Sequence, residues 1–427
     1  MKILVVGSGA REHALAWTLR QDPTVSEVVC TPGNPGIASV ARCVPADVSR
    51  PEQVLAVAES AGVDLTVVGP EMPLSNGVVD LFEARGRAIV GPTRAAAALE
   101  WSKAFAKDFM ARHGVPTARF HVCAGPEEAL AVVGAGTFGF PLVIKADGLA
   151  AGKGVVIAED RAGAEAAVRS MMVDRRFGAA GDRIVFEEFL VGQEASYFVL
   201  SDGTSFVTLS SAQDHKRIFD GDRGPNTGGM GAFAPSPLVT EAVERRIVDE
   251  IVRPVLDGMR REGMPYRGFL YVGLMLTAAG PKVIEFNVRF GDPEAQVILP
   301  MLGESLAALL MGAARRTLTP RAAVFKPERL VGVVLAAGGY PDDPETGRAV
   351  AGLEAAAATP GAIVFHAGTK MIDGALVTSG GRVLTVVGRG ATYEEAIEIA
   401  YRAAAHVRFD GLQFRSDIGK KALTIAS

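Results

Sequence analysis

Short apolar runs alternate with amphipathic stretches along the first hundred residues of the chain. Glycine or proline bounds each run within a few residues, which is the pattern of buried strands. Four strands are expected there, at 3–6, 27–30, 65–68 and 88–90. Apolar positions at helical spacing fill the intervals, at 11–20, 50–61 and 76–85. Strands that alternate with helices in this way predict a doubly wound parallel sheet.

Beyond residue 93 the pattern becomes helical and then rich in strands. Helical spacing over 93–113 ends at Gly114 and Pro116, and Ser102 is a plausible N-cap within it. Six strands are expected in the next part of the chain, at 142–145, 155–158, 184–188, 195–200, 269–277 and 282–286. Two helices are expected among them, at 161–173 and 240–262.

A stretch rich in proline and arginine at 318–328 indicates a boundary before a last module. That module is expected to hold strands at 331–336, 362–366 and 383–388 and a helix at 393–406. Two helices begin with the S/T-x-x-E pattern of a capping box, in which the first side chain accepts from a backbone N–H of the first turn. Ser49 with Glu52 and Thr392 with Glu395 are the matching pairs.

Composition narrows the class of protein. At roughly 100–200 residues per domain, 427 residues predict about three domains, and 48% hydrophobic residues exclude disorder as the main state. A net charge of −4 without a basic run argues against a nucleic-acid partner. No apolar stretch is long enough for a membrane helix or a signal peptide, so we expect no membrane association and a cytoplasmic location. The three scattered cysteines indicate neither a disulfide framework nor a zinc site.

The first strand runs into the glycine loop Gly7-Ser8-Gly9-Ala10-Arg11-Glu12. Backbone amides at such a turn can bind an anion. A nicotinamide dinucleotide site would need a third glycine where Glu12 stands and an acidic end to the second strand. We therefore expect one phosphate here, with Arg11 and His13 as donors. A tight turn without a ligand is the alternative.

The third strand ends at Gly69-Pro70-Glu71, where ligands bind in open α/β sheets. Glu71 has the chemistry to accept hydrogen bonds from ribose hydroxyls. Taken alone, however, it is more simply a solvated loop acid.

A second glycine loop follows the strand that ends at Lys145. Its positions Gly148, Gly152, Lys153 and Gly154 allow it to fold over a triphosphate, with Lys145 on an inner phosphate and Lys103 nearby on the preceding helix. The spacing is not that of a P-loop. A flexible hairpin tip is the simpler alternative.

Another strand ends in acids, in the run 186–194. Backbone groups there can bind an adenine edge, and Glu194 is spaced to reach ribose hydroxyls. An acidic strand end that only faces solvent is the alternative.

Glu285, Asn287 and Arg289 alternate onto one face of a strand. Carboxylate and amide oxygens suit Mg²⁺, and an arginine fork suits a carboxylate or a transferring phosphoryl group. Asp292, after Gly291, is positioned to accept from an amine. A sheet with one wet face is the alternative.

The segment 213–231 is too long and polar for a hairpin turn, and long loops in compact domains are usually functional. Asp214 and Asn226 are candidates to orient an amino-acid ammonium and an acyl oxygen, with Thr227 beside them. His215 is interpreted as a hydrogen-bonding loop residue rather than a base.

These motifs together resemble the phosphoribosylamine–glycine ligase family, also called glycinamide ribonucleotide synthetases. The segments that carry the resemblance are GSGAREHALAW, PGNPG, VVGPEMPL, SKAFAKDFM, KADGLAAGKGVV, DHKRIFDGDRGPNTGGMGAF, EFNVRFGDPE and VFHAGT. The resemblance runs from residue 1 to about residue 419. It implies an α/β ATP-grasp fold with an N-terminal doubly wound parallel-sheet domain, a small lid domain and a C-terminal α+β domain. The implied limits are 1–100, 101–325 with a lid at about 122–192, and 326–427.

The resemblance also implies roles for individual residues. For ATP these are Lys103, Lys145, Gly148, Gly152, Lys153, Gly154, Glu187, Glu188, Leu190 and Glu194. For phosphoribosylamine, glycine and the acyl phosphate they are Gly9, Arg11, Glu12, Asn34, Gly69, Glu71, Arg289, Gly291 and Asp292. Catalysis is assigned to Arg289, Lys145 and Asp292, and the metal to Glu285 and Asn287. Other ATP-grasp enzymes often have a further acidic metal ligand on the preceding strand, and residues 271–275 offer none.

The implied reaction joins glycine to 5-phosphoribosylamine with ATP, through glycyl phosphate, in purine biosynthesis. Mg²⁺, or Mn²⁺ in its place, is the expected ion, and a monomer or weak homodimer is the expected state. The glycine loop is expected to close over the reaction and exclude water. Two other hypotheses remain at this point: a nicotinamide oxidoreductase, and an ATP-binding scaffold with an inactive site.

Overall fold

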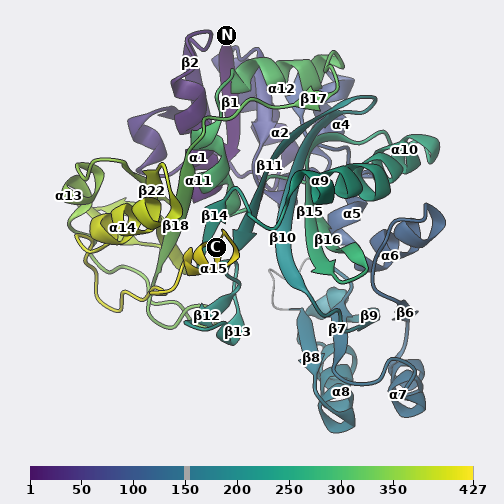
Figure 1. Cartoon of the computed structure of the whole chain (residues 1–427). Coiled ribbons are helices and arrows are strands. Elements are labelled where there is room, and N and C mark those ends of the chain that lie inside the picture. The colour runs from purple at the N-terminus through teal and green to yellow at the C-terminus, as the bar shows by residue number, and fades with distance from the viewer. Residues whose placement is uncertain (149–153, 427) are drawn as a thin grey trace.

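A computed structural model describes residues 1–148 and 154–426 and confirms the α/β class (Figure 1). A parallel sheet, a long mixed sheet and a small antiparallel sheet organise the chain, together with two short hairpins. No helix in those two ranges is long and apolar enough to cross a membrane.

The N-terminal hundred residues form the expected parallel sheet, in the strand order β3-β2-β1-β4-β5. Its strands are β1 (Lys2–Gly7), β2 (Glu27–Pro32), β3 (Arg42–Cys43), β4 (Leu65–Val68) and β5 (Ile89–Val90). The helices among them are α1 (Ala10–Arg20), η1 (Ile37–Ser39), α2 (Pro51–Ala61), α3 (Glu71–Ser75) and α4 (Val78–Ala84). Because parallel strands end on the same side, the loops after β1, β2 and β4 meet at one edge of the sheet.

The prediction that Ser49 caps α2 is wrong. The helix begins at Pro51, and the N-cap residue Arg50 makes no side-chain hydrogen bond. The Ser49 hydroxyl donates instead to Asp47 Oδ1 at 2.6 Å. Proline at the first helical position has the required φ and no N–H to satisfy, so the helix starts there without a side-chain cap.

The expected caps at Thr392 and Ser102 are confirmed. Thr392 Oγ1 accepts from Glu395 N at 3.3 Å at the start of α14 (Tyr393–Ala404). Ser102 Oγ accepts from Phe105 N at 3.2 Å at the start of α6 (Lys103–Arg112) and lies 3.1 Å from Asp147 Oδ1, to which it donates. Ser102 therefore connects the helix that carries Lys103 to the strand end beyond Lys145.

Replacing Ser102 with alanine should lower the free energy of unfolding by about 1–2 kcal/mol, because a helix cap and a buried hydrogen bond are both lost. Ser49→Ala is the matched control and should stay within about 0.5 kcal/mol. Urea denaturation of both variants measures the difference. Equal losses in the two variants would contradict the assigned caps.

The small antiparallel sheet has the strand order β6-β9-β7-β8 and lies at the lower right of Figure 1. Its strands are β6 (Phe120–Cys123), β7 (Leu142–Ala146), β8 (Val155–Ala158) and β9 (Ile184–Glu188). The helical segments around it are α7 (Pro126–Ala135), α8 (Arg161–Val168), η2 (Arg169–Val173) and η3 (Gly178–Gly181). The short helix α5 (Ala98–Trp101) precedes α6 and lies beside β16. A separate apolar cluster stabilises this unit, which occupies the part of the chain for which the lid is predicted.

The long sheet contains nine strands, in the order β16-β15-β10-β11-β14-β18-β22-β19, with β17 beside β11. The strands are β10 (Gln193–Asp202), β11 (Phe206–Asp214), β14 (Gly231–Ala234), β15 (Arg267–Thr277), β16 (Gly280–Asn287), β17 (Arg321–Ala322), β18 (Arg329–Ala336), β19 (Ala362–His366) and β22 (Arg382–Gly390). Since β14 pairs with both β11 and β18, the C-terminal strands continue the central sheet without a break.

Helices and two hairpins complete the chain. The helical segments are α9 (Glu241–Ile247), η4 (Val248–Val252), α10 (Arg253–Arg261), α11 (Glu294–Ile298), η5 (Leu299–Met301), α12 (Leu306–Arg315), α13 (Leu353–Ala357) and α15 (Lys420–Ala426). The hairpins pair β12 (Arg217–Phe219) with β13 (Arg223–Asn226), and β20 (Thr369–Ile372) with β21 (Ala375–Thr378). The expected helices at 161–173 and 240–262 each contain one π-helical turn.

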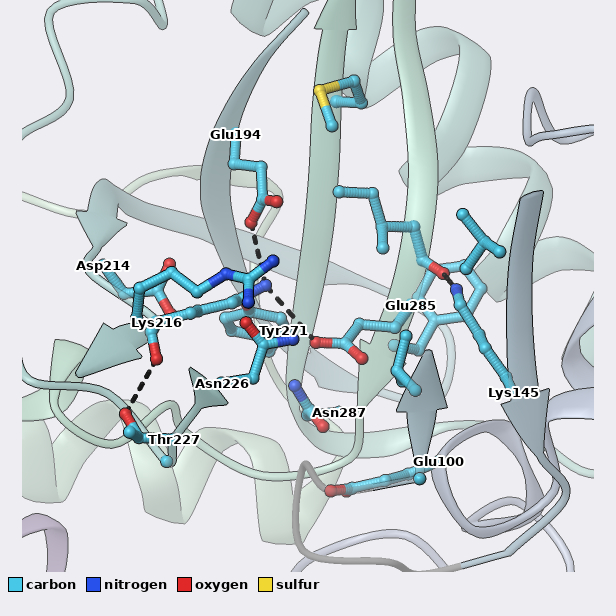
Figure 2. Close-up of a pocket in the computed structure, with 18 of the residues that line it drawn as sticks. Glu100, Lys145, Glu194, Asp214, Lys216, Asn226, Thr227, Tyr271, Glu285 and Asn287 are labelled. Carbon is cyan, nitrogen blue, oxygen red and sulfur yellow. Dashed lines mark hydrogen bonds and ion pairs between the residues drawn. The ribbon is translucent and has the colours of Figure 1, made fainter. Parts of the chain in front are cut away.

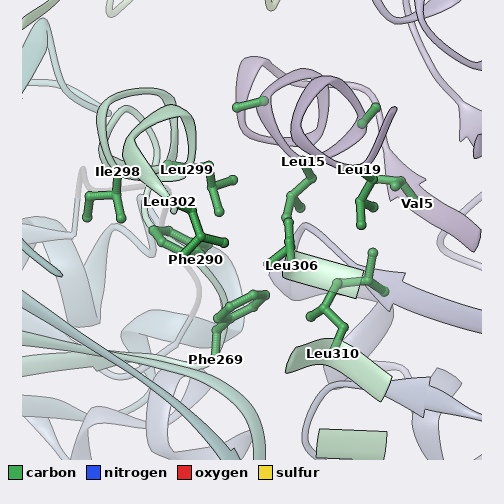
Figure 3. Packing of buried hydrophobic residues seen from close by; sticks show 14 of the residues in the cluster. Val5, Leu15, Leu19, Phe269, Phe290, Ile298, Leu299, Leu302, Leu306 and Leu310 are labelled. Atoms are coloured by element: carbon green, nitrogen blue, oxygen red, sulfur yellow. The ribbon is translucent and has the colours of Figure 1, made fainter. Parts of the chain in front are cut away.

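One apolar cluster joins the N-terminal and central units. Figure 3 shows Leu15 and Leu19 of α1 above Leu306 of α12, with Phe269 and Phe290 of the central unit to the left of Leu306. All five side chains are buried, and full burial of such a side chain contributes about 1.5–3 kcal/mol. This packing holds the loops of the parallel sheet against the central sheet, where the two form one cleft.

Candidate active site

A cleft of about 1260 Å³ lies among the three sheets. It collects most of the predicted site residues, although they are far apart in the sequence. Those that line it are Arg11, Glu71, Lys103, Lys145, Gly148, Gly154, Glu187, Glu188, Leu190, Glu194, Asp214, Asn226, Thr227, Glu285, Asn287, Arg289 and Asp292. Gly9, Glu12, Asn34, Gly69 and Gly291 are not among the lining residues, and Gly152 and Lys153 lie outside the described residues.

Lys145 enters the cleft from β7 and is held by two groups. Its Nζ lies 2.8 Å from Glu187 Oε1 and donates to Ile284 O at 3.2 Å. Glu187 Oε2 lies 2.8 Å from a second buried lysine, Lys107, one helical turn after Lys103 on α6. Burial opposes ionisation of Glu187, but Lys145 and Lys107 prevail and lower its pKa. The Glu187 carboxylate therefore orients the two lysines.

Lys107 was not singled out from the sequence. Burial lowers the pKa of Lys107 to about 8, against the opposing effect of Glu187. Its only sequence signal is the spacing of four residues from Lys103, which puts both amines on one face of a helix. Lys103 itself donates from Nζ to Gly148 O at 2.9 Å, at the start of the glycine loop.

The acids at the end of β9 face different surroundings. Glu188 pairs with Arg119 at 2.7 Å and with Lys282 at 3.3 Å. Although burial acts in the opposite direction, these partners lower the pKa of Glu188 to about 2. Both carboxylates thus have protein partners, and the segment from Glu187 to Glu194 lines this side of the cleft.

The predicted metal residues occupy the end of β16, opposite β15 (Figure 2). Glu285 pairs in register with Gly273 and Asn287 with Tyr271, while Phe286 and Val288 are buried on the other face. The alternation predicted for Glu285 and Asn287 is confirmed. β16 ends at Asn287, so Arg289 follows the strand rather than lying in it.

The donor set fits a divalent cation that takes oxygen ligands. Glu285 offers a carboxylate with a side chain 38% exposed to the cleft, and Asn287 offers an amide oxygen. Mg²⁺ commonly takes one or two protein ligands and fills its remaining positions with water and phosphate oxygens.

Lys216 is a cleft residue that was not singled out from the sequence. Its Nζ lies 3.8 Å from Glu285 Oε1 and 3.0 Å from Glu194 Oε2.

Arg289 is enclosed by two carboxylates. Its Nη2 lies 3.1 Å from Glu100 Oε1, and its Nε lies 3.4 Å from Glu71 Oε2. Glu100 also accepts from Val288 N at 2.7 Å. Burial opposes the charge on Arg289, yet Glu100 and Glu71 raise its pKa. Glu71 is thus a partner of Arg289 rather than a solvated loop acid, and Glu100 is a buried anchor that no motif indicated.

The segment 213–231 contains a hairpin, contrary to the expectation that it is a long loop too polar for a hairpin turn. β12 and β13 pair between Arg217 and Asn226, and the turn rests on the C-terminal segment. Asp222 there lies 2.9 Å from Arg415, whose side chain is fully buried. The hairpin follows Asp214, whose pKa burial raises to about 7 despite the nearby Lys216.

The interpretation of His215 as a hydrogen-bonding residue is wrong. Its side chain is buried beside Phe233, and neither ring nitrogen has a hydrogen-bond partner in the described part of the chain. The pKa of His215 is lowered to about 4, mainly by burial, and the positive charges of Lys421 and Arg415 add to this effect. The ring is therefore neutral at pH 7 and acts as an apolar group.

His215 should make the fold sensitive to acid. The unfolded chain binds a proton near pH 6.5 and the folded chain only near pH 4, so stability falls as the pH is lowered through this window. At pH 5 the loss is about 2 kcal/mol. His215→Phe should remove it, and urea denaturation at pH 7 and pH 5 measures the change. An unaltered acid dependence in the variant would contradict the assignment.

The first glycine loop is filled by Glu12. Its carboxylate accepts from Gly9 N at 2.6 Å and lies 2.6 Å from Arg11 Nε. A Cβ at Gly69 would lie only 2.1 Å from Glu12 Oε1, so the loop after β4 needs glycine there. The carboxylate lies where a dinucleotide pyrophosphate would approach, which argues against the nicotinamide hypothesis.

Two other residues near this edge connect it to the C-terminal part. Asn34 donates to Ser8 O at 2.8 Å and to His366 O at 2.9 Å. His13 Nδ1 accepts from His366 N at 2.9 Å, and burial lowers the pKa of His13 to about 3. His13 is therefore neutral at pH 7, and the prediction that it supplies a positive charge to an anion is wrong. Because Nδ1 accepts, Nε2 carries the proton, and a donor role for His13 stays a prediction.

The comparisons with known proteins first define the class. The biotin carboxylase domain of a 2-oxoglutarate carboxylase from Hydrogenobacter thermophilus has the same fold, with a TM-score of 0.73 at 17% identity over 96% of this chain and 91% of that one. A family model of the ATP-grasp domain of phosphoribosylglycinamide synthetase matches residues 101–295. The structural match shows the fold, and the family match defines the class, an ATP-grasp carbon–nitrogen ligase.

The chain belongs to the phosphoribosylamine–glycine ligase family. Models of the N and C domains of phosphoribosylglycinamide synthetase match residues 1–100 and 330–421. A ligase of this name from Pseudomonas aeruginosa is 52% identical over 99% of this chain and 98% of its own length. A relative from Ralstonia nicotianae is 50% identical over 99% of this chain and its own full length. The crystal structure of the Thermotoga maritima ligase has a TM-score of 0.86 at 36% identity, over 98% of this chain and 100% of that one.

Proposed function

We propose that this chain ligates glycine to 5-phosphoribosylamine through glycyl phosphate, in the cleft among its three sheets. Membership of the family establishes ATP-dependent ligation of these two substrates in purine biosynthesis. The observation that carries the proposed residue roles is the convergence of Lys145, Glu285 and Arg289 on one cleft with the N-terminal loops.

The first step activates a poor acyl donor. A carboxylate resists attack by an amine because its leaving group would be oxide. One glycine carboxylate oxygen therefore attacks the γ-phosphorus of ATP, and the bond to the β-phosphate oxygen breaks to release ADP. Lys145 and Lys103 supply positive charge to the phosphates, and Arg289 supplies a fork for charge on the transferring group. Glu187 and Lys107 keep Lys145 in place.

The second step forms the amide. The amine of phosphoribosylamine attacks the acyl carbon of glycyl phosphate, loses a proton and expels phosphate, which gives glycinamide ribonucleotide. Asp292, Asp214 and Asn226 are assigned to the ammonium and acyl groups of glycine, with Thr227 beside them. The N-terminal loops that carry Gly9, Arg11, Glu12, Asn34, Gly69 and Glu71 are assigned to phosphoribosylamine. Glycyl phosphate is sensitive to hydrolysis, so we assign the unit at 122–192 to exclude water.

The metal and the nucleotide contacts complete the proposal. Glu285 and Asn287 would hold Mg²⁺, or Mn²⁺ in its place, and the ion would neutralise charge on the phosphates. The backbone from Glu187 to Leu190 is assigned to adenine and Glu194 to the ribose. Gly148, Gly152, Lys153 and Gly154 are assigned to the phosphates. Gly291 is assigned to the glycine side, where a Cβ would lie 2.4 Å from Glu294 Oε2.

The cysteines bear on the cellular location of the protein. Cys30, Cys43 and Cys123 are free thiols, which suits the reducing cytoplasm that we propose as the location. The partners we propose are the three small molecules ATP, glycine and phosphoribosylamine, without nucleic acid or membrane. A monomer or weak homodimer stays a prediction.

Release of ADP under omission of each substrate tests the proposal. ADP should form over many turnovers only when glycine and phosphoribosylamine are both present. Mass spectrometry should identify glycinamide ribonucleotide as the product. ADP release that does not depend on glycine would contradict the glycyl phosphate route. Absence of turnover with all three substrates and Mg²⁺ would favour the scaffold hypothesis.

A further inference from the structure

Arg382 is an arginine of the C-terminal part that reaches into the ligase cleft. It begins β22 and lines the cleft, although no motif marked it. Its Nη2 lies 3.0 Å from Asp292 Oδ2, and its Nη1 donates to Asp292 O at 2.8 Å. The same Nη1 donates to Gly228 O at 2.5 Å. One guanidinium thus holds two segments of the central unit.

The turn at Gly228 is built closely around this side chain. A Cβ on Gly228 would lie 3.1 Å from Arg382 Cζ and 3.3 Å from Tyr340 Oη, which is tighter than ordinary contact. Gly228 N donates to Tyr340 Oη at 2.9 Å. Gly229 has a φ of +111°, and a Cβ there would lie 2.5 Å from Pro293 Cδ. The turn directly follows Asn226 and Thr227, so its placement also places these two residues.

Asp292 has two anchors, and Arg382 is the charged one. Gln296 Nε2 donates to Asp292 Oδ1 at 2.7 Å, while Arg382 occupies Oδ2. Arg382 also binds the backbone of Asp292, so it fixes both the position of the residue and the direction of its carboxylate. Only a planar fork serves the carboxylate, the Asp292 carbonyl and the Gly228 carbonyl together. A lysine would replace it with a single point charge.

We propose that Arg382 is a positioning residue for the ligation, through which the C-terminal part of the chain sets Asp292 and the Gly228 turn. The inference rests on the proposed function, where Asp292, Asn226 and Thr227 are assigned to glycine and its acyl phosphate. ATP is assigned to the side of the cleft that is lined by Lys145 of β7 and by the segment that follows β9. Loss of Arg382 should therefore impair the use of glycine and spare the binding of ATP.

Three variants test this positioning role. Arg382→Gln and Arg382→Lys should each lower kcat/KM for glycine about 100-fold, while the Kd for ATP stays within twofold. Millimolar methylguanidine should restore part of the activity of Arg382→Ala. Arg402→Gln is the matched control, because this arginine pairs with Glu398 on the exposed face of α14. The control should match the parent in kcat/KM and in Tm.

The outcomes separate this inference from the proposed function. Unchanged kcat/KM for glycine in Arg382→Gln would overturn the inference. So would a loss of Tm with equal losses for ATP and glycine, since that would indicate a structural role only. Asp292→Asn tests the role that the proposed function assigns to Asp292, independently of Arg382. Full activity of this variant would contradict that role and, with it, the inference on Arg382. If Arg382→Gln fails to fold, Arg382→Lys gives the same readouts with the charge retained.

Discussion

Replacing Glu285 with glutamine should reduce turnover about 1000-fold and leave Tm within a few degrees. The change removes one negative charge and keeps the shape of the side chain. Loss of a metal ligand at the transferring phosphoryl group corresponds to about 4 kcal/mol of transition-state stabilisation. Steady-state ADP release over a range of Mg²⁺ concentrations measures the effect, and the variant should need more Mg²⁺ for its residual activity.

The control for Glu285→Gln is Glu250→Gln. Glu250 pairs with Arg246 on an exposed helical face, so its loss should not alter turnover. If Glu285→Gln showed the turnover and the Mg²⁺ dependence of the parent, Glu285 would not be a metal ligand. A large loss of Tm would instead indicate that the carboxylate stabilises the fold.

Arg289→Met should abolish detectable turnover and also destabilise the protein by about 3 kcal/mol. The two effects have different causes. Turnover is lost because no fork remains for the transferring group. Stability is lost because Glu100, 7% exposed, and Glu71 then lack their charged partner. Assays of ADP release and urea denaturation on the same preparation measure both effects.

Arg289→Lys separates the two effects, because it keeps the charge for Glu100 and removes the fork. It should recover most of the stability while turnover stays at least about 100-fold below that of the parent. Near-normal activity in the lysine variant would mean that charge alone suffices at this position. Normal stability in Arg289→Met would contradict the buried network of carboxylates.

The pattern of the sequence predicted β1, β2, β4 and β5 of the parallel sheet, because buried strands leave short apolar runs bounded by glycine and proline. It missed β3, which is only two residues long. It also predicted the alternation of Glu285 and Asn287 along β16, since side chains alternate faces in any strand. The hairpin at 217–226 was not predicted because half of its residues are polar or charged. Its support comes from Arg415, which is distant in the chain.

The predicted site residues came from motifs. The motifs do not include the charged residues that pair with these site residues and hold them in place. Lys107, Glu100 and Arg382 each pair with a predicted site residue across a long sequence separation. Such pairs depend on tertiary packing, so local spacing does not reveal which residues pair. The same limit explains the error at His13, whose burial depends on β19 at the other end of the chain.

The position of β14 restricts where this protein can be divided. β14 pairs with β11 on one side and with β18 on the other, so the C-terminal strands complete hydrogen bonds of the central sheet. A fragment that stops before residue 329 would leave β14 as an open edge, and open edges favour aggregation. The family segment at 330–421 is therefore not a separable module, because its strand β18 completes the sheet that carries residues of the cleft.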